Sequence, residues 1–178
     1  MKKGKKNTSL KKITDLSIFI LIVLATAYLL VTFVTQRTRV DGISMEPTLY
    51  DGDNIMMDKL SYHFRSPKRK EIICFVPYGS KEILIKRVIG LPGETVRIEN
   101  GDIYIDGEIF NDHIGGMNYA GRAAQDIVLG RDEFFVLGDN RTDSVDSRYD
   151  EIGNVDGKRI LGRAFLLFYP FNRVRVVK

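Results

Sequence analysis

The strongest constraint on this chain is an uncharged apolar segment near its N-terminus. Residues 16–34 contain nineteen residues without one charged side chain, and only Ser17, Thr26, Tyr28 and Thr32 are polar. A helix of that length spans about 28 Å, close to the hydrocarbon thickness of a bilayer. Serine and threonine hydroxyls are tolerated in such a helix because they can bond back to its carbonyls. The segment therefore predicts one helix that crosses the lipid bilayer.

The residues around this segment predict its orientation. Residues 1–12 hold six lysines and no acidic residue, and a basic flank favours a cytoplasmic N-terminus. We therefore expect a basic cytoplasmic tail (1–12), a transmembrane signal anchor (13–35) and an extracytoplasmic domain (36–178), in a single-pass protein of the plasma membrane. A cleavable signal peptide is the alternative, but its apolar region is usually about 7–15 residues long and ends in a small-x-small site. Bulky Phe33 and Val34 stand there instead, which favours an uncleaved anchor.

The basic character of the chain comes from its tail. Without the six tail lysines and Asp15, 21 of the 27 basic and 22 of the 23 acidic residues remain, so the outward domain is near neutral and nucleic acid is not an expected partner. Cys74, the only cysteine, lies in an apolar run and is interpreted as a core residue. His63 and His113 have no metal-ligand spacing, so neither a metal nor another cofactor is expected.

The outward domain shows alternating strands rather than helical periodicity. Asn100-Gly101 and Asp106-Gly107 stand between such strands and predict tight hairpins. Residues 111–126 have no clear pattern, and we interpret about 106–130 as a variable excursion. The predicted fold class is mostly β, an antiparallel sheet or barrel-like catalytic domain behind one N-terminal transmembrane helix. The predicted strands are residues 54–57, 71–76, 82–89, 95–99, 102–105, 108–110, 133–137, 160–169 and 174–177.

A serine on a predicted turn lies near the start of the outward domain. Ser44 lies between Gly42 and Pro47, in the segment Gly42-Ile43-Ser44-Met45-Glu46-Pro47-Thr48-Leu49. Most serines in such surroundings only stabilise a turn, so a nucleophile needs a base from elsewhere in the chain. Both histidines lie in polar, loop-like segments, so the base is not expected to be histidine.

Lys86 is the one lysine in an apolar strand pattern. With a period of two it shares a face with Leu84 and Val88. A free lysine, with a pKa of about 10.4, is neutral in roughly one molecule in 2,500 at pH 7, but burial lowers this pKa and can produce a working base. The simpler alternative is a lysine whose stem covers apolar surface while its amine reaches water.

A third polar segment follows the predicted strand 133–137. It reads Gly138-Asp139-Asn140-Arg141-Thr142-Asp143-Ser144-Val145-Asp146-Ser147-Arg148. Such a run is usually an exposed acidic loop. It can also hold a catalytic amine in position through hydroxyls and ion pairs.

Together these three segments, in this order behind an anchor, resemble the type I signal peptidases. These are membrane-anchored serine proteases that remove signal peptides from exported proteins, and the resemblance covers most of residues 14–170. The short chain with one anchor is similar to the Gram-positive type. The matching segments are residues 42–49, residues 86–94 (Lys86-Arg-Val-Ile-Gly-Leu-Pro-Gly-Glu94) and residues 138–148.

The resemblance implies a Ser-Lys dyad. Ser44 would attack the scissile carbonyl, neutral Lys86 would take its proton, and the Ser44 main-chain N–H would donate to the oxyanion. Some family members have a serine where this chain has Gly42, so the second oxyanion donor in the Gly42 region is unassigned. The resemblance also implies that Ser144 hydrogen-bonds the Lys86 amine and that two ion pairs support the site, Asp146 with Arg148 and Asp139 with Arg87.

The implied substrates are the signal peptides of secretory preproteins, cut after small-x-small sites. An extended peptide can add as a strand along residues 38–43 and 83–85, with alternate side chains in pockets. Two alternatives stay open: a peptide-binding module that does not cleave, and another Ser-Lys protease, such as a self-cleaving repressor, which would need a DNA-binding domain. The expected substrate-binding residues are Thr38, Val40, Gly42, Ile43, Met45, Ile83, Leu84 and Ile85.

Overall fold

The computed structural model describes residues 4–114 and 116–177, without the side chains of 4–10 and 29–33. The chain divides into two compact units, Met1–Gln36 and Arg37–Lys178. The predicted anchor falls in the first unit and lies partly outside the described side chains.

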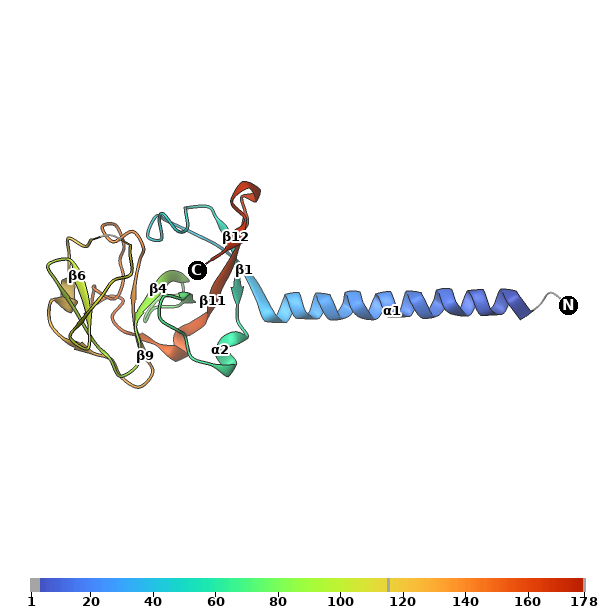
Figure 1. Cartoon of the computed structure of the whole chain (residues 1–178), viewed down its shortest axis with the longest axis horizontal. Helices are drawn as coiled ribbons and strands as arrows, with labels where there is room; N and C mark the ends of the chain where they lie inside the picture. Colours follow the sequence, from blue (N-terminus) through green and yellow to red (C-terminus); the bar gives the residue numbers. More distant parts are fainter. Residues whose placement is uncertain (1–3, 115, 178) are drawn as a thin grey trace. The chain divides into compact units, whose positions relative to one another are not determined.

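The first unit is the long helix α1 (Gly4–Val34), labelled in Figure 1. Two of its hydroxyls bond back to helix carbonyls, Ser17 Oγ to Ile13 O at 2.9 Å and Thr26 Oγ1 to Ile22 O at 2.8 Å. Within the described part of the chain, no helix combines the length and the apolar character needed to cross a membrane.

The second unit is built from two antiparallel sheets, as the predicted fold class requires. The first has the order β1-β2-β11-β3-β4-β9-β10 with β12 beside β11, and the second has the order β7-β6-β5-β8. In Figure 1, β4 and β9 lie between β6 of the second sheet and β11 and β12 of the first. The strands are β1 (Thr35–Arg39), β2 (Asn54–Asp58), β3 (Ile72–Phe75), β4 (Leu84–Gly90), β5 (Thr95–Glu99), β6 (Asp102–Ile105), β7 (Glu108–Phe110), β8 (Ile127–Val128), β9 (Glu133–Leu137), β10 (Val155–Asp156), β11 (Ile160–Tyr169) and β12 (Arg175–Val176).

Both predicted hairpins are confirmed. Asn100 and Gly101 have φ values of 53° and 87°, and Asp106 and Gly107 have 52° and 83°. Two consecutive positive φ values define the tight hairpin turns that Asn-Gly and Asp-Gly favour. They join β5 to β6 and β6 to β7 in register.

The described part of residues 106–130, interpreted from the sequence as a variable excursion, has little regular structure. These residues begin near β7 and end just after β8, and both strands belong to the second sheet. Between them, the described residues form only a short 3₁₀ helix, Gly121–Ala124. Sequence analysis also missed three short strands, β1, β8 and β10, and the short helix α2 (Ser61–Phe64).

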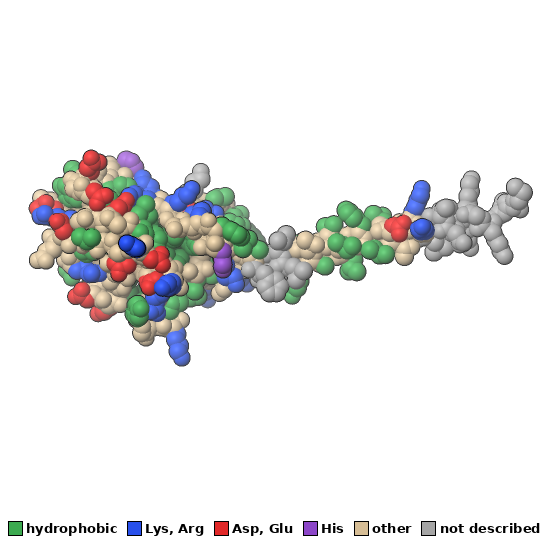
Figure 2. Space-filling model, turned by 90° about the horizontal axis from the view of Figure 1, so that it is seen from below, with side chains coloured by type: hydrophobic (Ala, Val, Ile, Leu, Met, Phe, Trp, Pro, Cys, Tyr) green, Lys and Arg blue, Asp and Glu red, His purple; other side chains and the backbone are tan. Residues whose placement is uncertain are grey.

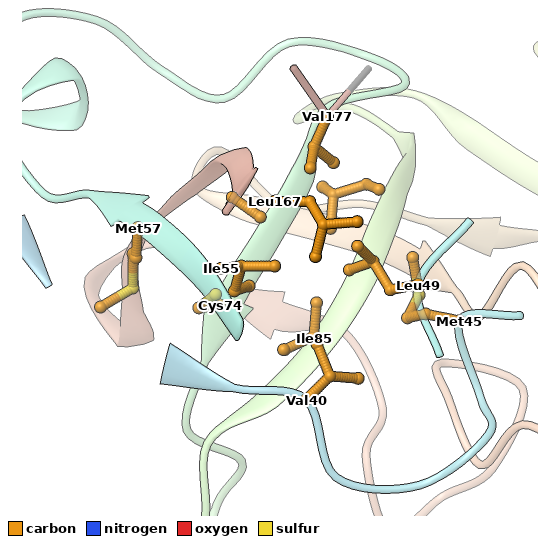
Figure 3. Close-up of a cluster of buried hydrophobic side chains, with 11 residues drawn as sticks. Val40, Met45, Leu49, Ile55, Met57, Cys74, Ile85, Leu167 and Val177 are labelled. Atoms are coloured by element: carbon orange, nitrogen blue, oxygen red, sulfur yellow. The ribbon is translucent and has the colours of Figure 1, made fainter. Parts of the chain in front are cut away.

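Three clusters of buried apolar side chains form the core. The first, shown in Figure 3, brings Val40, from the loop after β1, together with Ile85 of β4. The sheet therefore curls so that these two segments share one cluster. Cys74 lies in the same cluster and is fully buried, as predicted, and burial raises the pKa of its thiol to about 12. On the surface, Figure 2 shows acidic and basic side chains interspersed on the visible face of the second unit.

Candidate active site

The structure brings Ser44 and Lys86 into contact across 42 residues of sequence. Lys86 Nζ donates a hydrogen bond to Ser44 Oγ at 2.8 Å. Ser44 lies in a turn between β1 and β2, which is closed by a bond from Leu49 N to Met45 O at 2.8 Å. Both Met45 and Leu49 are buried in the first core cluster. This packing fixes the turn and leaves Ser44 half-buried at its edge.

Lys86 is buried among apolar neighbours, as its strand pattern predicted. It is 3% exposed and lies between Leu84 and Val88 on β4, opposite Ile73 on β3. Burial lowers the pKa of its amine to about 8, against the charges of Asp146 and Asp139, which raise it. Desolvation wins because an ammonium in an apolar environment loses more hydration than two carboxylates restore. The alternative of an amine that reaches water does not apply.

Gly138 allows the segments that carry Ser44, Lys86 and Ser144 to pack closely together. It directly follows β9, whose Leu137 pairs with Arg87, so it adjoins Lys86 in the sheet. A Cβ atom at Gly138 would overlap the side chain of Ser144 and the main-chain oxygen of Ser44. Glycine is therefore required here for close packing of three segments around the amine.

The predicted ion pair between Asp146 and Arg148 is present and fully buried. Arg148 Nε and Nη2 donate to the two carboxylate oxygens at 2.8 and 2.9 Å, and the two side chains are 0% and 1% exposed. Asp146 Oδ2 also accepts a bond from Gly138 N at 3.0 Å. The pair therefore holds the strand end beside Lys86.

The predicted pair between Arg87 and Asp139 is also present. Arg87 Nε and Nη2 donate to the carboxylate at 2.7 and 2.6 Å, and Arg87 Nη1 donates to Lys70 O at 2.7 Å. Because Arg87 follows Lys86 on the strand, it points to the opposite face. The pair joins β4 to the segment after β9 without touching the amine.

Ser144 differs from its expected role in this structure. Its side chain is buried and adjoins Gly138, but its Oγ has no hydrogen-bond partner among the described residues. The bond to the Lys86 amine is therefore not formed here, where Lys86 Nζ bonds to Ser44 instead.

Asn140, which sequence reasoning did not single out, contacts the turn that holds Ser44. Its main-chain N–H donates to Ser44 O at 3.1 Å, and its Nδ2 donates to Ile43 O at 3.3 Å. The main chain and the side chain of Asn140 thus hold the two peptide groups on either side of Ser44. Its position inside the third polar segment was the only available signal.

Gly42 has an unusual conformation just before the nucleophile. Its φ is +88°, a left-handed value that suits glycine, and its N–H donates to Asp51 Oδ1 at 2.9 Å. No hydrogen bond among the described residues uses the Ser44 main-chain N–H. This N–H is therefore available to an oxyanion, while Gly42 supplies no side-chain donor.

The expected substrate-binding residues divide by exposure. Val40, Met45 and Ile85 are at most 7% exposed and belong to the core, whereas Ile43 is 48% exposed. Thr38, Ile83 and Leu84 are half-buried. β9 pairs with β4 only from Arg87 onward, so the described residues leave the other edge of β4 without a strand beside Leu84 and Ile85.

A serine hydroxyl bonded to a buried amine of lowered pKa, on an antiparallel β framework, is an arrangement that suits a serine hydrolase. The family model described as "Signal peptidase, peptidase S26" matches residues 13–169. The chain therefore belongs to the signal peptidase family S26 and is a serine peptidase of the signal peptidase I type. The family resemblance that its three segments indicated is confirmed.

Several relatives illustrate this membership. A signal peptidase I of Bacillus amyloliquefaciens is 35% identical over 189 residues and the full length of both chains. A probable signal peptidase I-2 of Synechocystis is 38% identical over 149 residues, 80% of this chain and 67% of that one. A crystal structure of a signal peptidase I from Enterococcus faecalis has a TM-score of 0.48 at 32% identity, covering 56% of this chain and 97% of that chain.

Proposed function

We propose that this signal peptidase cuts signal peptides from exported preproteins with a Ser44–Lys86 catalytic dyad. The observation that carries the proposal is the 2.8 Å contact between Lys86 Nζ and Ser44 Oγ, with a lysine only 3% exposed. With a pKa of about 8, about one amine in ten is neutral at pH 7, against about one in 2,500 for a free lysine. Burial thus supplies the base.

The chemistry follows from this contact. Neutral Lys86 takes the hydroxyl proton as Ser44 Oγ bonds to the scissile carbonyl carbon, and the resulting oxyanion accepts a hydrogen bond from the Ser44 main-chain N–H. The Lys86 ammonium then gives its proton to the leaving amine as the peptide bond breaks. Lys86 next removes a proton from water, whose oxygen attacks the ester carbonyl. As the bond to Ser44 Oγ breaks, the Lys86 ammonium returns this proton to Ser44 Oγ, which releases the signal peptide and restores the serine hydroxyl and the neutral amine.

The supporting residues hold this geometry without reacting. Asp146 and Arg148 anchor Gly138, while Asp139 and Arg87 anchor the segment that continues to Asn140. Ser144, buried beside Gly138 with an unbonded hydroxyl, is suited to receive the amine after proton transfer. This hydroxyl would then orient Lys86 toward the water molecule of the second step.

The substrate peptide is proposed to bind as an added strand. The free edge of β4 at Leu84 and Ile85 offers main-chain groups, and Ile85 shares a core cluster with Val40 of the loop after β1. An extended peptide can therefore lie between β4 and residues 38–43. Half-buried Thr38, Ile83 and Leu84 and exposed Ile43 are its side-chain contacts, whereas Val40, Met45 and Ile85 form the floor beneath. Because these buried side chains fill the floor, small residues are proposed at the first and third positions before the cut.

Membrane anchoring is part of the same proposal. The uncharged residues 16–34 lie in one continuous helix, α1, and six lysines precede them, which favours a cytoplasmic N-terminus. Only ten residues lead from Val34 to Ser44. The catalytic domain would then work outside the cell membrane, close to where a signal peptide leaves the bilayer.

Cleavage of a preprotein with an Ala-x-Ala site tests the dyad. Ser44→Ala and Lys86→Ala should each abolish cleavage and retain the fold, while Lys81→Ala, at an exposed lysine five residues earlier, should cleave normally. The wild-type rate should rise with pH to a plateau above an apparent pKa of about 8. Full activity in either dyad variant would refute the assignment. If wild type bound the peptide without cutting it, the binding-module alternative would be favoured.

A further inference from the structure

Asp112 is an acidic residue to which the reaction as described assigns no role. It lies in the segment after β7, and its carboxylate pairs with Arg141 Nη2. The Arg141 and Asp112 side chains are 2% and 7% exposed. Asp112 Oδ1 also accepts a bond from Ile114 N at 3.2 Å, which holds the carboxylate in its own loop.

Arg141 connects Asp112 to Gly138, which adjoins the proposed catalytic residues. Its Nε donates to Gly138 O at 2.8 Å, while its own main-chain oxygen accepts from Arg148 Nη1 at 2.8 Å. On the other side of the same glycine, Gly138 N donates to Asp146 Oδ2. Charged side chains therefore hold Gly138 on both sides, and Asp112 compensates the charge of one of them.

The position of Gly138 matters because it adjoins the reacting groups. A Cβ there would overlap Ser144 and Ser44 O, and Asn140, two residues later, bonds to the serine turn. A shift of this segment would move the turn relative to Lys86. Misplacement of reacting groups by about 1 Å can lower a rate by about 10²-fold.

Arg141 depends on Asp112 electrostatically. Among the described residues, Asp112 is the carboxylate that pairs with Arg141, and Arg141 Nη1 has no hydrogen-bond partner in the same set. A buried guanidinium without a counter-ion is strongly unfavourable. Without Asp112 it would turn toward water or toward Asp146, and the Gly138 carbonyl would lose its donor.

We propose that Asp112 is a positioning residue for signal-peptide cleavage, which acts by pairing with Arg141 and thereby fixing Gly138 beside Ser44 and Lys86. This role presupposes the Ser44–Lys86 dyad proposed above. It also gives the irregular segment after β7 a part in catalysis, although no hydrogen bond joins its described residues to Ser44 Oγ or Lys86 Nζ.

Steady-state cleavage by the full-length chain tests this role. Asp112→Asn keeps the shape of the side chain and removes its charge. It should lower kcat by about 10- to 100-fold and leave KM within about twofold, because Asp112 does not contact the peptide. Asp112→Glu should fall between wild type and Asp112→Asn. The matched control is Asp126→Asn, at an exposed carboxylate of the same segment, which should behave like wild type.

A double variant separates action through Arg141 from a general loss of structure. Asp112→Asn combined with Arg141→Gln should cleave no more slowly than Arg141→Gln alone, because the removed charge has no partner left. If the losses in kcat from the two single variants multiply in the double variant, the proposal is overturned. An unchanged kcat in Asp112→Asn, or a change confined to its KM, would overturn it as well. If Asp112→Asn does not fold, Arg141→Gln measured alone decides by the same kcat and KM comparison, because Asp112 is proposed to act through Arg141. A wild-type kcat in that variant overturns the role.

Ser44→Ala, measured alongside, distinguishes the two levels of inference. Full activity in Ser44→Ala would refute the proposed dyad itself. An inactive Ser44→Ala together with a wild-type-like Asp112→Asn would overturn only the positioning role.

Discussion

Replacing Lys86 with methionine should abolish cleavage and stabilise the fold at neutral pH. Methionine has a similar length and no charge, so it suits the apolar surroundings of Leu84, Val88 and Ile73. Wild type, by contrast, holds a buried amine there whose pKa is lowered from 10.5 to about 8. This buried amine, the proposed base, therefore destabilises the folded protein.

The size of this effect follows from the two pKa values. Below pH 8 the lysine is charged in both folded and unfolded protein, and burial of the ammonium costs about 3.4 kcal/mol, at 1.36 kcal/mol for each pH unit between the values. Between pH 8 and 10.5 only the unfolded chain keeps the proton, so wild-type stability rises with pH. Above 10.5 the amine is neutral in both states and the cost is gone. Loss of the bond to Ser44 offsets about 1 kcal/mol, which leaves a net gain of about 2 kcal/mol at pH 7.

Urea denaturation of both full-length chains in the same detergent, at pH 7 and pH 10.5, measures this. The free-energy advantage of Lys86→Met should be about 2 kcal/mol at pH 7 and should disappear, or change sign, at pH 10.5. Lys81→Met, at an exposed lysine, controls for general effects of lost charge. If the free energies of unfolding of Lys86→Met and wild type differ equally at both pH values, burial does not lower the Lys86 pKa. The proposal that Lys86 is the general base would then fail.

Two further variants test the packing around the amine. Gly138→Ala should lower kcat/KM by about 10²-fold or more, because its Cβ would overlap Ser144 and Ser44 O; Gly116→Ala, which meets open space, is the control, and normal cleavage by Gly138→Ala would contradict the close approach. Asp146→Ala should lower the free energy of unfolding by about 3–5 kcal/mol, because it leaves buried Arg148 unpaired. In the same urea titration, Glu99→Ala removes one partner of an exposed ion pair and should change the free energy of unfolding by less than about 1 kcal/mol. An equal loss of stability in Asp146→Ala and Glu99→Ala would argue against the burial of Asp146.

Much of the fold could be predicted because its signals are local. Strand alternation and two Asn-Gly or Asp-Gly turns located most strands of the second unit, and their hairpins have the expected geometry. β1 (Thr35–Arg39) was missed because its five residues are all polar, and β10 because it has only two residues. The division into two sheets depends on pairings between distant strands, such as β5 with β8, which no local pattern reveals.

The sequence by itself determined the chemical groups of this protein: a serine on a turn, a lysine on an apolar strand face, a polar segment able to support it, and an uncharged segment before them. These follow from residue type and spacing alone. Only the tertiary structure decided that Ser44 and Lys86 meet at 2.8 Å, that Gly138 leaves room for them, that Asn140 bonds to the serine turn, and that Arg141 joins Asp112 to Gly138. The physical reason is that burial and contact distance depend on which distant strands and loops pack together, and a pKa near 8 exists only once that packing has removed water from the amine.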